Sequence, residues 1–374
     1  MKRRTLLAQT AAGVATIALP VRAQAARIVL GQSAPLSGAA AALGTQFKAG
    51  ADLFFARLNA RGGVNGKAIE LRSLDDGYEP DRCAANTKKL IDEGVLACFG
   101  YIGTPTSLAA LPLATAARTP FVAPFTGAQA LREPFNRHAF HVRASYYDET
   151  EDIVKQITSI GLKRVGVFHQ NDSYGKAGLD GVTRALKPLN LQPASLGTVE
   201  RNSVDVAAAV KSILAAKPDA IVQISAYKSC AAFIREARKA GFGGTFYNVS
   251  FVGTAALAKE LGPDARGVVV SQVMPFPFNP MTALAGEYLA AGKAALGDKF
   301  EPNYSGIEGY IAARVIAEGF KRGGAPTPDN LIAGLESLRD FNLGGFYVDF
   351  SPTKHTGSKF VDLTILTADG RVRL

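Results

Sequence analysis

Residues 100–107 read Gly-Tyr-Ile-Gly-Thr-Pro-Thr-Ser and join an apolar run, residues 95–99, to a helical run, residues 108–117. A strand that ends in glycine, threonine and serine and then opens a helix presents free backbone N–H groups and hydroxyls, which suit a small anion. In an open parallel sheet, ligands gather at this carboxyl end of the strands. The stretch therefore predicts a turn at a ligand site, with a capped turn that binds nothing as the alternative.

The same order of strand, polar turn and helix repeats along the chain. Strands are predicted at residues 27–33, 67–75, 95–99, 120–124, 138–143, 164–169, 192–199, 220–225, 245–249 and 268–273, with two more between 345 and 374. Helices are predicted at residues 47–58, 81–93, 108–117, 153–160, 176–188, 204–216, 231–240, 282–296, 305–322 and 329–337. This alternation predicts an α/β fold with doubly wound parallel sheets.

The length of the chain, 374 residues, is too great for one ordinary core, so two lobes are expected. Changes in composition place crossings between the lobes at Ala144–Asp148, at the proline-rich Pro275–Pro280 and near Phe346–Phe350. Residues 26–145 and 277–346 then form an N-terminal lobe, and residues 146–276 and 347–374 a C-terminal lobe.

The first 25 residues have the features of an export signal. Lys2, Arg3 and Arg4 give a basic start, residues 11–19 an apolar core, and residues 23–25, Ala-Gln-Ala, a cleavage site. A signal peptide at residues 1–25 predicts a periplasmic protein, and the paired Arg3 and Arg4 also allow the twin-arginine route.

Loss of Lys2, Arg3, Arg4 and Arg22 with the signal lowers the formal charge from +10 to +6. The remaining basic residues are scattered and form no stripe of the kind that binds nucleic acid. Such a charge suits an anionic ligand or a negatively charged membrane surface better.

Three cysteines remain in a mature chain that an oxidising compartment would receive. Cys83 lies at the start of a predicted helix and Cys98 near the end of the next strand, two ends that lie on the same side of a βα unit. We therefore predict a Cys83–Cys98 disulfide, with two small buried residues as the alternative. Cys230 is expected on a helix face.

Motifs that mark catalytic sites are missing. The sequence has no GxGxxG, no Walker phosphate loop and no GxSxG elbow, and two SxxK matches, at residues 225–228 and 351–354, lack their companion motifs. His138 and His141 are three apart on a predicted strand and point to opposite faces, so no metal site is predicted. The sequence thus indicates a binding protein with no cofactor, although an exported α/β enzyme stays an alternative.

Hydroxyl and aromatic side chains recur where the predicted strands end, in both lobes. They are Thr104, Thr106, Thr126, Tyr174, Tyr227 and Ser250. Each alone is typical of a loop or a helix cap, but their shared position favours binding without bond chemistry.

Four motifs occur in order over residues 27–374: Ala34–Gly38 (APLSG), Ala60–Gly66 (ARGGVNG), Asp75–Pro80 (DDGYEP) and Ile234–Arg238 (IREAR). Together they resemble the branched-chain amino-acid (leucine/isoleucine/valine-binding) type of periplasmic substrate-binding proteins. The resemblance implies the periplasmic-binding-protein type I fold, with two α/β lobes joined by three crossovers and a ligand cleft between them. It also implies a monomer that delivers a small molecule to the permease subunits of an ATP-binding-cassette importer.

In amino-acid-binding members, the first lobe holds the ligand carboxylate with hydroxyls and backbone N–H groups. By position, Gly103, Thr104, Phe125 and Thr126 match these groups, and Tyr174 and Tyr227 match the two aromatic residues that close over the ligand. The sequence departs from the family at Ser250, near which such members carry an acid that pairs with the ligand ammonium.

A buried ammonium without a charged partner is costly, so Ser250 favours a carboxylate ligand without an ammonium, such as an aromatic acid or a keto acid. An acid from elsewhere, for example Asp172 or Glu308, would restore a receptor for branched-chain or other amino acids. A sensor component that presents its ligand to a membrane receptor is a further alternative.

Overall fold

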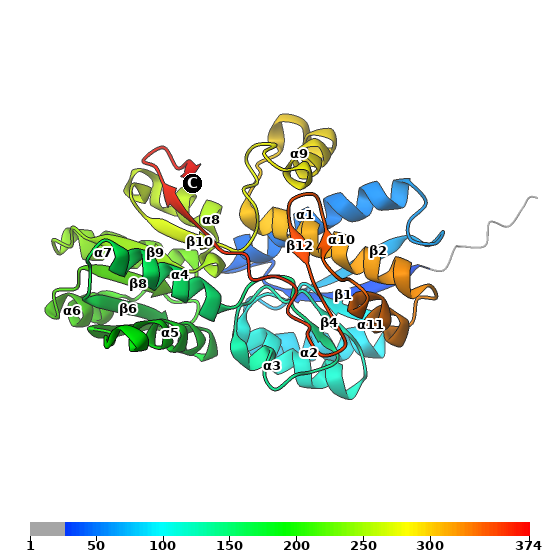
Figure 1. Cartoon of the computed structure of the whole chain (residues 1–374), viewed down its shortest axis with the longest axis horizontal. Helices are drawn as coiled ribbons and strands as arrows, with labels where there is room; N and C mark the ends of the chain where they lie inside the picture. Colours follow the sequence, from blue (N-terminus) through cyan, green and yellow to red (C-terminus); the bar gives the residue numbers. More distant parts are fainter. Residues whose placement is uncertain (1–26) are drawn as a thin grey trace, which may run out of the picture.

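The computed structural model describes residues 27–374 and has two α/β lobes that lie side by side (Figure 1). The predicted signal peptide, residues 1–25, lies outside the described residues. Within the described part, none of the helices combines the length and apolar character that crossing a bilayer requires.

The N-terminal lobe is built on a five-stranded sheet in the order β2-β1-β3-β4-β5. Its strands are β1 (Ile28–Ala34), β2 (Ile69–Asp75), β3 (Ala97–Phe99), β4 (Phe121–Val122) and β5 (Ala139–Phe140). Its helices are α1 (Ala41–Ala60), α2 (Pro80–Asp92), α3 (Thr104–Ala116), α9 (Ala283–Leu296), α10 (Tyr304–Gly323) and α11 (Pro328–Glu336). All strand pairs are parallel. Figure 1 shows α1 and α10 over one side of the sheet, with α2 and α3 on the other.

The C-terminal lobe has a seven-stranded sheet in the order β14-β13-β10-β9-β8-β6-β7. Its strands are β6 (Val165–Gln170), β7 (Ser195–Val199), β8 (Ala220–Ile224), β9 (Thr245–Asn248), β10 (Val269–Gln272), β13 (Asp362–Leu366) and β14 (Val372–Arg373). Its helices are α4 (Tyr146–Ser159), α5 (Ser173–Leu186), α6 (Ala207–Ala215), α7 (Tyr227–Lys239) and α8 (Thr254–Leu261). The strands β6 to β10 pair in parallel, whereas β13 pairs antiparallel with β10 and β14 pairs antiparallel with β13 at one edge of the sheet. The predicted α/β class and the two doubly wound lobes are therefore confirmed.

Short elements complete both lobes. A separate two-stranded ribbon consists of β11 (Phe341–Asn342) and β12 (Tyr347–Val348). Single turns of 3-10 helix are η1 (Gln129–Leu131), η2 (Lys187–Leu189), η3 (Ser250–Val252), η4 (Gly262–Ala265) and η5 (Gly297–Lys299).

Helices α1 and α10 approach closely because glycines line their contact. A Cβ atom at Gly50 would overlap the carbonyl oxygen of Gly306, and a Cβ atom at Gly309 would overlap that of Phe47. The rings of Phe54 and Tyr310 pack edge to face beside this contact, with centroids 5.3 Å apart. The two helices therefore form one tightly packed unit above the first sheet.

The third crossing lies further along the chain than the sequence predicts. Residues 346–357 stay with the N-terminal lobe: the Phe350 N–H donates to the Leu338 carbonyl at 2.7 Å, and the His141 N–H donates to the His355 carbonyl at 2.8 Å. The rings of His355 and Phe140 stack with centroids 3.8 Å apart. The polar turn at residues 351–354 brings the chain back to β5, so the boundary predicted at residue 346 moves to residues 358–361, just before β13.

The predicted Cys83–Cys98 disulfide is wrong for this structure, in which Cys83, Cys98 and Cys230 are all free and buried. The Tyr101 hydroxyl donates to the Cys98 sulfur at 3.6 Å, so the thiol has a hydrogen-bond partner in place of a disulfide. The alternative of small buried residues describes these cysteines.

We expect all three thiols to resist alkylation in the folded protein. Burial raises the pKa of Cys98 to about 12 and raises the pKa of Cys83 and Cys230 further, so little thiolate forms near neutral pH. Mass spectrometry after iodoacetamide treatment should find labels only when denaturant is added first. A cross-linked Cys83–Cys98 peptide in a map made without reductant would contradict this expectation.

Candidate functional site

The carboxyl ends of the strands in both lobes point toward one interlobe cleft. In the N-terminal lobe, the start of α3 and the turn after β4 line the cleft. In the C-terminal lobe, the starts of α4 and α5 and the turn η3 line it. These are the places where an open α/β sheet exposes its ligand groups.

Two threonine hydroxyls meet on the N-terminal side of the cleft. Thr104 follows Gly103, whose φ of 98° favours glycine, and its Oγ1 lies 2.6 Å from Oγ1 of Thr126. Thr126 Oγ1 also accepts the N–H of Ala128 at 3.2 Å. The ring of Tyr78 covers Gly103 so closely that a Cβ atom there would overlap it. The structure thus brings together the predicted residues Gly103, Thr104 and Thr126.

An aromatic cluster joins the two lobes beside these hydroxyls. Phe251 of the C-terminal lobe packs on Phe125 and Tyr78 of the N-terminal lobe, with ring centroids 5.6 and 5.9 Å apart. Tyr174 lies 4.6 Å from Phe251 and 5.4 Å from Tyr146, again between ring centroids. Phe251 therefore links the predicted residues Phe125 and Tyr174 across the cleft. Tyr78 and Tyr146 are further aromatic partners that the sequence did not single out.

Tyr227 occupies a different part of the cleft. It opens α7, and its hydroxyl lies near the backbone of Ala42, close to the start of α1. The structure therefore places Tyr227 against the opposite lobe but outside the cluster formed by Phe125, Phe251 and Tyr174.

Ser250, also predicted, belongs to a buried charged network. Its hydroxyl accepts a hydrogen bond from Arg143 and donates to Glu149 Oε1 at 3.0 Å, while its N–H donates to Glu149 Oε2 at 2.7 Å. Arg143 also forms an ion pair with Glu308, with 3.4 Å between Nε and Oε1, and its guanidinium lies over the Phe125 ring at 4.5 Å. Ser271 adds a third hydrogen bond to Glu149, at 2.6 Å to Oε2.

Burial and neighbouring charges shift the titration of this network. Burial raises the pKa of Glu308 to about 7, and the Arg143 guanidinium opposes this shift only in part. Burial also raises the pKa of Glu149, again against the effect of Arg143. Burial disfavours the charge on Arg143, but the carboxylates of Glu308 and Glu149 outweigh it and raise its pKa. Arg143 thus keeps its positive charge although it is buried. It lies between the carboxyl groups of Glu308 and Glu149, whose surroundings differ.

Sequence reasoning did not single out Arg143 or Glu149 and named Glu308 only as a distant alternative. Arg143 lies at the end of a predicted strand, next to a lobe crossing. This position could have indicated a role in the site, because ligand groups collect at the ends of strands. Glu149 lies in the acidic run of residues 148–152, which reads like a solvated helix start, yet its side chain is completely buried.

The closed cleft leaves a cavity of only about 10 Å³, lined by residues that include Phe125, Arg143, Ser250, Tyr304 and Glu308. That is about the room of one water molecule. Entry of a ligand therefore requires the lobes to separate or the aromatic side chains to move.

Polar contacts also cross the cleft at its rim. Arg201 Nη2 lies 2.8 Å from Glu79 Oε2, and Asn202 Nδ2 donates to Glu79 Oε1 at 2.8 Å. Gln170 Nε2 donates to the Tyr78 hydroxyl at 3.3 Å. We refer to the contacts of Glu79 with Arg201 and Asn202 as the rim latch.

We expect Arg201→Ala to weaken ligand affinity about two- to fivefold by removing part of the closed-state contacts. Arg201 and Glu79 are partly exposed, which limits the pair to about 0.2–1 kcal/mol. Stopped-flow measurement should place the change mainly in faster ligand release, because the latch forms after the lobes meet. The exposed pair Lys88–Asp92 offers a control, since Lys88→Ala should leave release unchanged.

Comparison with known proteins agrees with this two-lobed, cleft-forming arrangement. A family model described as periplasmic binding protein matches residues 27–371. The chain is similar to the structure of a possible leucine/isoleucine/valine-binding protein from Rhodopirellula baltica, with 34% identity, a TM-score of 0.90, and coverage of 95% of this chain and 97% of that one. A substrate-binding periplasmic protein from Ralstonia solanacearum is 32% identical with a TM-score of 0.87, over 92% of this chain and 99% of that one.

A curated relative, named amino acid binding protein, comes from Pseudomonas aeruginosa and is 25% identical over 316 residues, which is 83% of each chain. The names of these relatives describe binding proteins, so the chain is a binding protein and not an enzyme. The family also implies a periplasmic location. The resemblance inferred from the sequence motifs is therefore confirmed: the chain belongs to the periplasmic binding protein family, in its branched-chain amino-acid type.

Proposed function

We propose that this protein captures a small carboxylate with an apolar body in the interlobe cleft and delivers it to the permease subunits of an ATP-binding-cassette importer. An aromatic acid or a keto acid fits this description. The predicted signal at residues 1–25 would export the protein, and the paired Arg3 and Arg4 would suit the twin-arginine route.

The main support for the proposal is which charged groups in the cleft already have partners and which do not. Arg143 is a buried cation beside Phe125, and within residues 27–374 its Nη1 has no hydrogen-bond partner. The Glu149 carboxylate already accepts three hydrogen bonds, and Glu308 is paired with Arg143. A ligand carboxylate would find an unpaired donor here, whereas a ligand ammonium would have to compete for both acids.

The threonine pair and the aromatic cluster supply the remaining ligand contacts. Thr104 and Thr126 stand at the start of α3 and in the turn after β4, where hydroxyls and N–H groups favour an anion. Phe125, Tyr174 and Phe251 offer flat apolar faces for the rest of the ligand.

An amino-acid receptor is the second candidate, because the Pseudomonas aeruginosa relative is named an amino acid binding protein. For that ligand, Glu308 would leave Arg143 and pair with the ammonium. The two candidate ligands differ in whether Glu308 stays paired with Arg143 or pairs with the ligand. This difference can be tested directly.

Thermal-shift measurements with matched ligands test the proposal, each amino acid against its keto acid. At a hundredfold excess over the dissociation constant, a true ligand should stabilise the fold by about 2.7 kcal/mol. We expect 4-methyl-2-oxopentanoate and phenylpyruvate to stabilise the protein more than leucine and phenylalanine do. Stabilisation by leucine without its keto acid would overturn the proposal in favour of the amino-acid receptor.

Thr104→Ala provides the mutational test of the same site. Loss of its hydroxyl should weaken carboxylate binding by about 1.5 kcal/mol, or about tenfold, as for a hydrogen bond to a charged group. Titration calorimetry with the best acid measures the change. Thr45→Ala, in the exposed first turns of α1, is the matched control and should bind like the unaltered protein.

A further inference from the structure

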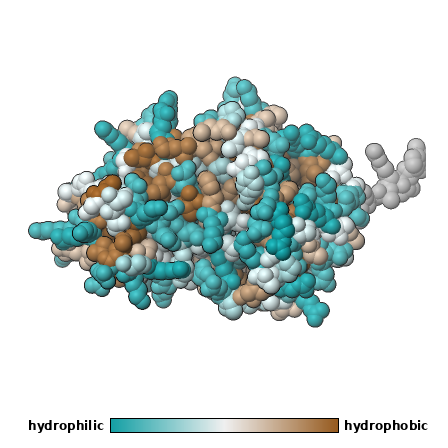
Figure 2. All heavy atoms as spheres, viewed as in Figure 1, coloured by the Kyte–Doolittle hydropathy of each residue, from teal (hydrophilic) through white to brown (hydrophobic). Residues whose placement is uncertain are grey.

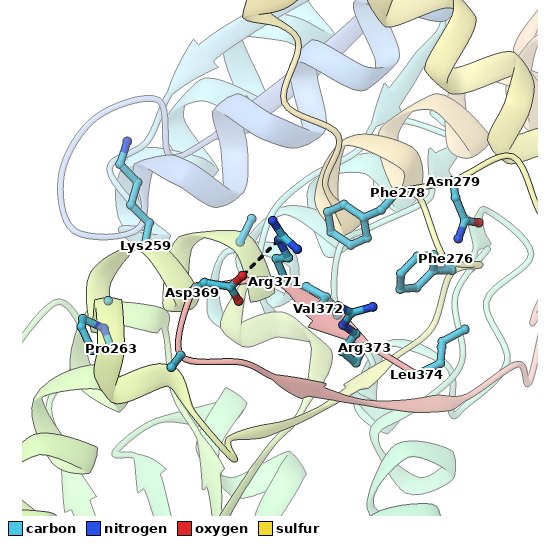
Figure 3. A pocket seen from close by; sticks show the side chains of 15 residues that line it. Lys259, Pro263, Phe276, Phe278, Asn279, Asp369, Arg371, Val372, Arg373 and Leu374 are labelled. Atoms are coloured by element: carbon cyan, nitrogen blue, oxygen red, sulfur yellow. Dashed lines mark ion pairs between the residues drawn. The ribbon is translucent and has the colours of Figure 1, made fainter.

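A second, much larger cavity opens outside the cleft. Its volume is about 930 Å³, and it lies between α8 with η4, the crossing that follows β10, and β14 (Figure 3). This volume falls within the range of sites that hold small organic molecules. We call it the outer groove.

Apolar side chains form much of the outer groove, and basic side chains surround it. Figure 2 shows apolar residues gathered on this face around the chain end that Figure 1 marks. In Figure 3, Phe276 and Phe278 project from the crossing toward β14, where Val372 and Leu374 lie. The basic residues are Lys259, Arg371 and Arg373, of which Arg371 pairs with Asp369 at 3.1 Å.

The buried side chain of Tyr304 lies between the inner cavity and two phenylalanines of the outer groove. Tyr304, the first residue of α10, lines the small inner cavity together with Arg143 and Glu308. On its other side, its ring lies 5.8 Å from that of Phe278 and 6.5 Å from that of Phe276, measured between centroids. Only 7% of Tyr304 is exposed, so its ring is packed between residues that line the two cavities.

The crossing after β10 also connects the two cavities along the chain. Val273 and Met274 line the inner cavity, and Phe276, Phe278 and Asn279 line the outer groove. Because this segment joins the lobes, separation of the lobes would move it and the Tyr304 contact together. The same motion that admits a ligand to Arg143 would thus open a path to the outer groove.

We propose that the outer groove is the distal part of the ligand site, and that the ligand is an elongated carboxylate. Its carboxylate would lie at Arg143, and its apolar chain would pass Tyr304 and end between Phe276 and Phe278. This inference rests on the proposed function, since it extends the same carboxylate site. The long apolar stems of Lys259 and Arg373 add to the apolar surface of the groove.

Two acids that share a phenyl end but differ in length test the proposal. Phenylacetate reaches only the inner site, whereas 8-phenyloctanoate is long enough to enter the outer groove. Calorimetry should give the longer acid about tenfold or greater affinity in the unaltered protein, because more apolar surface is buried. Phe278→Ala should remove most of that gain and leave phenylacetate binding unchanged.

A second variant guards against a folding defect in Phe278→Ala. Ala255→Trp fills the outer groove from α8 and should likewise weaken only the longer acid. Phe135→Ala, at an exposed phenylalanine near His355, is the matched control and should retain the gain. A photoreactive 8-(4-azidophenyl)octanoate should label residues 276–279 or 371–374, as peptide mapping would show.

The outcomes separate the two proposals. Equal affinity for both acids, with no effect of either groove variant, would overturn the elongated ligand and leave the carboxylate receptor intact. Labelling confined to other peptides would do the same. Failure of both acids to bind, with leucine bound, would overturn the proposed function and the outer groove as its extension.

Discussion

Arg143→Met should destabilise the protein by about 3–5 kcal/mol and abolish carboxylate binding. Arg143 is 1% exposed and contacts Glu308 and Ser250, so its loss would leave buried acids without their cation. Chemical denaturation should show a lower midpoint, and calorimetry should show no heat with acids that the unaltered protein binds.

A double variant separates the effect on stability from the effect on binding. Arg143→Met with Glu308→Gln removes both members of the ion pair, and we expect it to recover a large part of the lost stability. Carboxylate binding should stay absent, because the donor is still missing. Restored binding in the double variant would show that Arg143 serves the fold alone and would contradict the proposed ligand contact.

Affinity for a carboxylate should fall about ten- to fiftyfold between about pH 6 and pH 9. The pKa of Glu308 is raised to about 7, so Glu308 is largely neutral at the lower pH and ionised at the higher one. An ionised Glu308 repels a bound carboxylate and holds Arg143 more strongly. Calorimetry across this pH range measures the effect, and Glu308→Gln should make the affinity nearly independent of pH.

The sign of this dependence distinguishes the two candidate ligands. A ligand ammonium would need the ionised form of Glu308, so amino-acid affinity would rise with pH over the same range. Burial raises the pKa of Asp76 to about 6, and Asp76→Asn is therefore the control that should keep the pH dependence.

Stability without ligand should also decline as the pH rises through about 7. A raised folded-state pKa means that the folded protein binds the Glu308 proton more tightly than the unfolded chain does. The stabilisation from this group is therefore fully present below the ordinary carboxyl pKa and is lost as pH increases through the folded value. At low pH the Glu308 carboxyl is neutral, as the amide of Glu308→Gln is at every pH. The denaturation midpoints of the two proteins should therefore converge at low pH, provided that the amide fits beside Arg143 as well as the neutral carboxyl does.

Local signals explain why the fold could be predicted well from sequence. β6 and β8 are buried along their whole length and appear as short apolar runs, as expected of central parallel strands. The sequence predicts a helix only from residue 153, but α4 begins at Tyr146, where Ser145 and Asp148 form a capping box that marks the start. α8 was missed between Gly253 and Gly262, where a helix of eight residues gives little periodicity.

The candidate site divides into a predictable and an unpredictable part. Thr104, Thr126 and Tyr174 follow from the rule that ligand groups collect at strand ends, which needs only the order of elements. The Arg143 network depends on contacts between distant segments, since Arg143 and Ser250 are 107 residues apart. Charged residues are seldom completely buried, so sequence reasoning assigns Glu149 to the surface by default.

The glycine contacts between α1 and α10 limit how this receptor can diversify. Any side chain at Gly50 or Gly309 would meet backbone atoms of the facing helix, so neither position can change alone without shifting a helix. Because α10 also carries Tyr304 and Glu308, which line the inner cavity, that shift would disturb the proposed ligand site at the same time. If the outer groove holds the distal end of the ligand as proposed, substitutions at the crossing residues Phe276 and Phe278 would change its shape while the helix pair stays fixed.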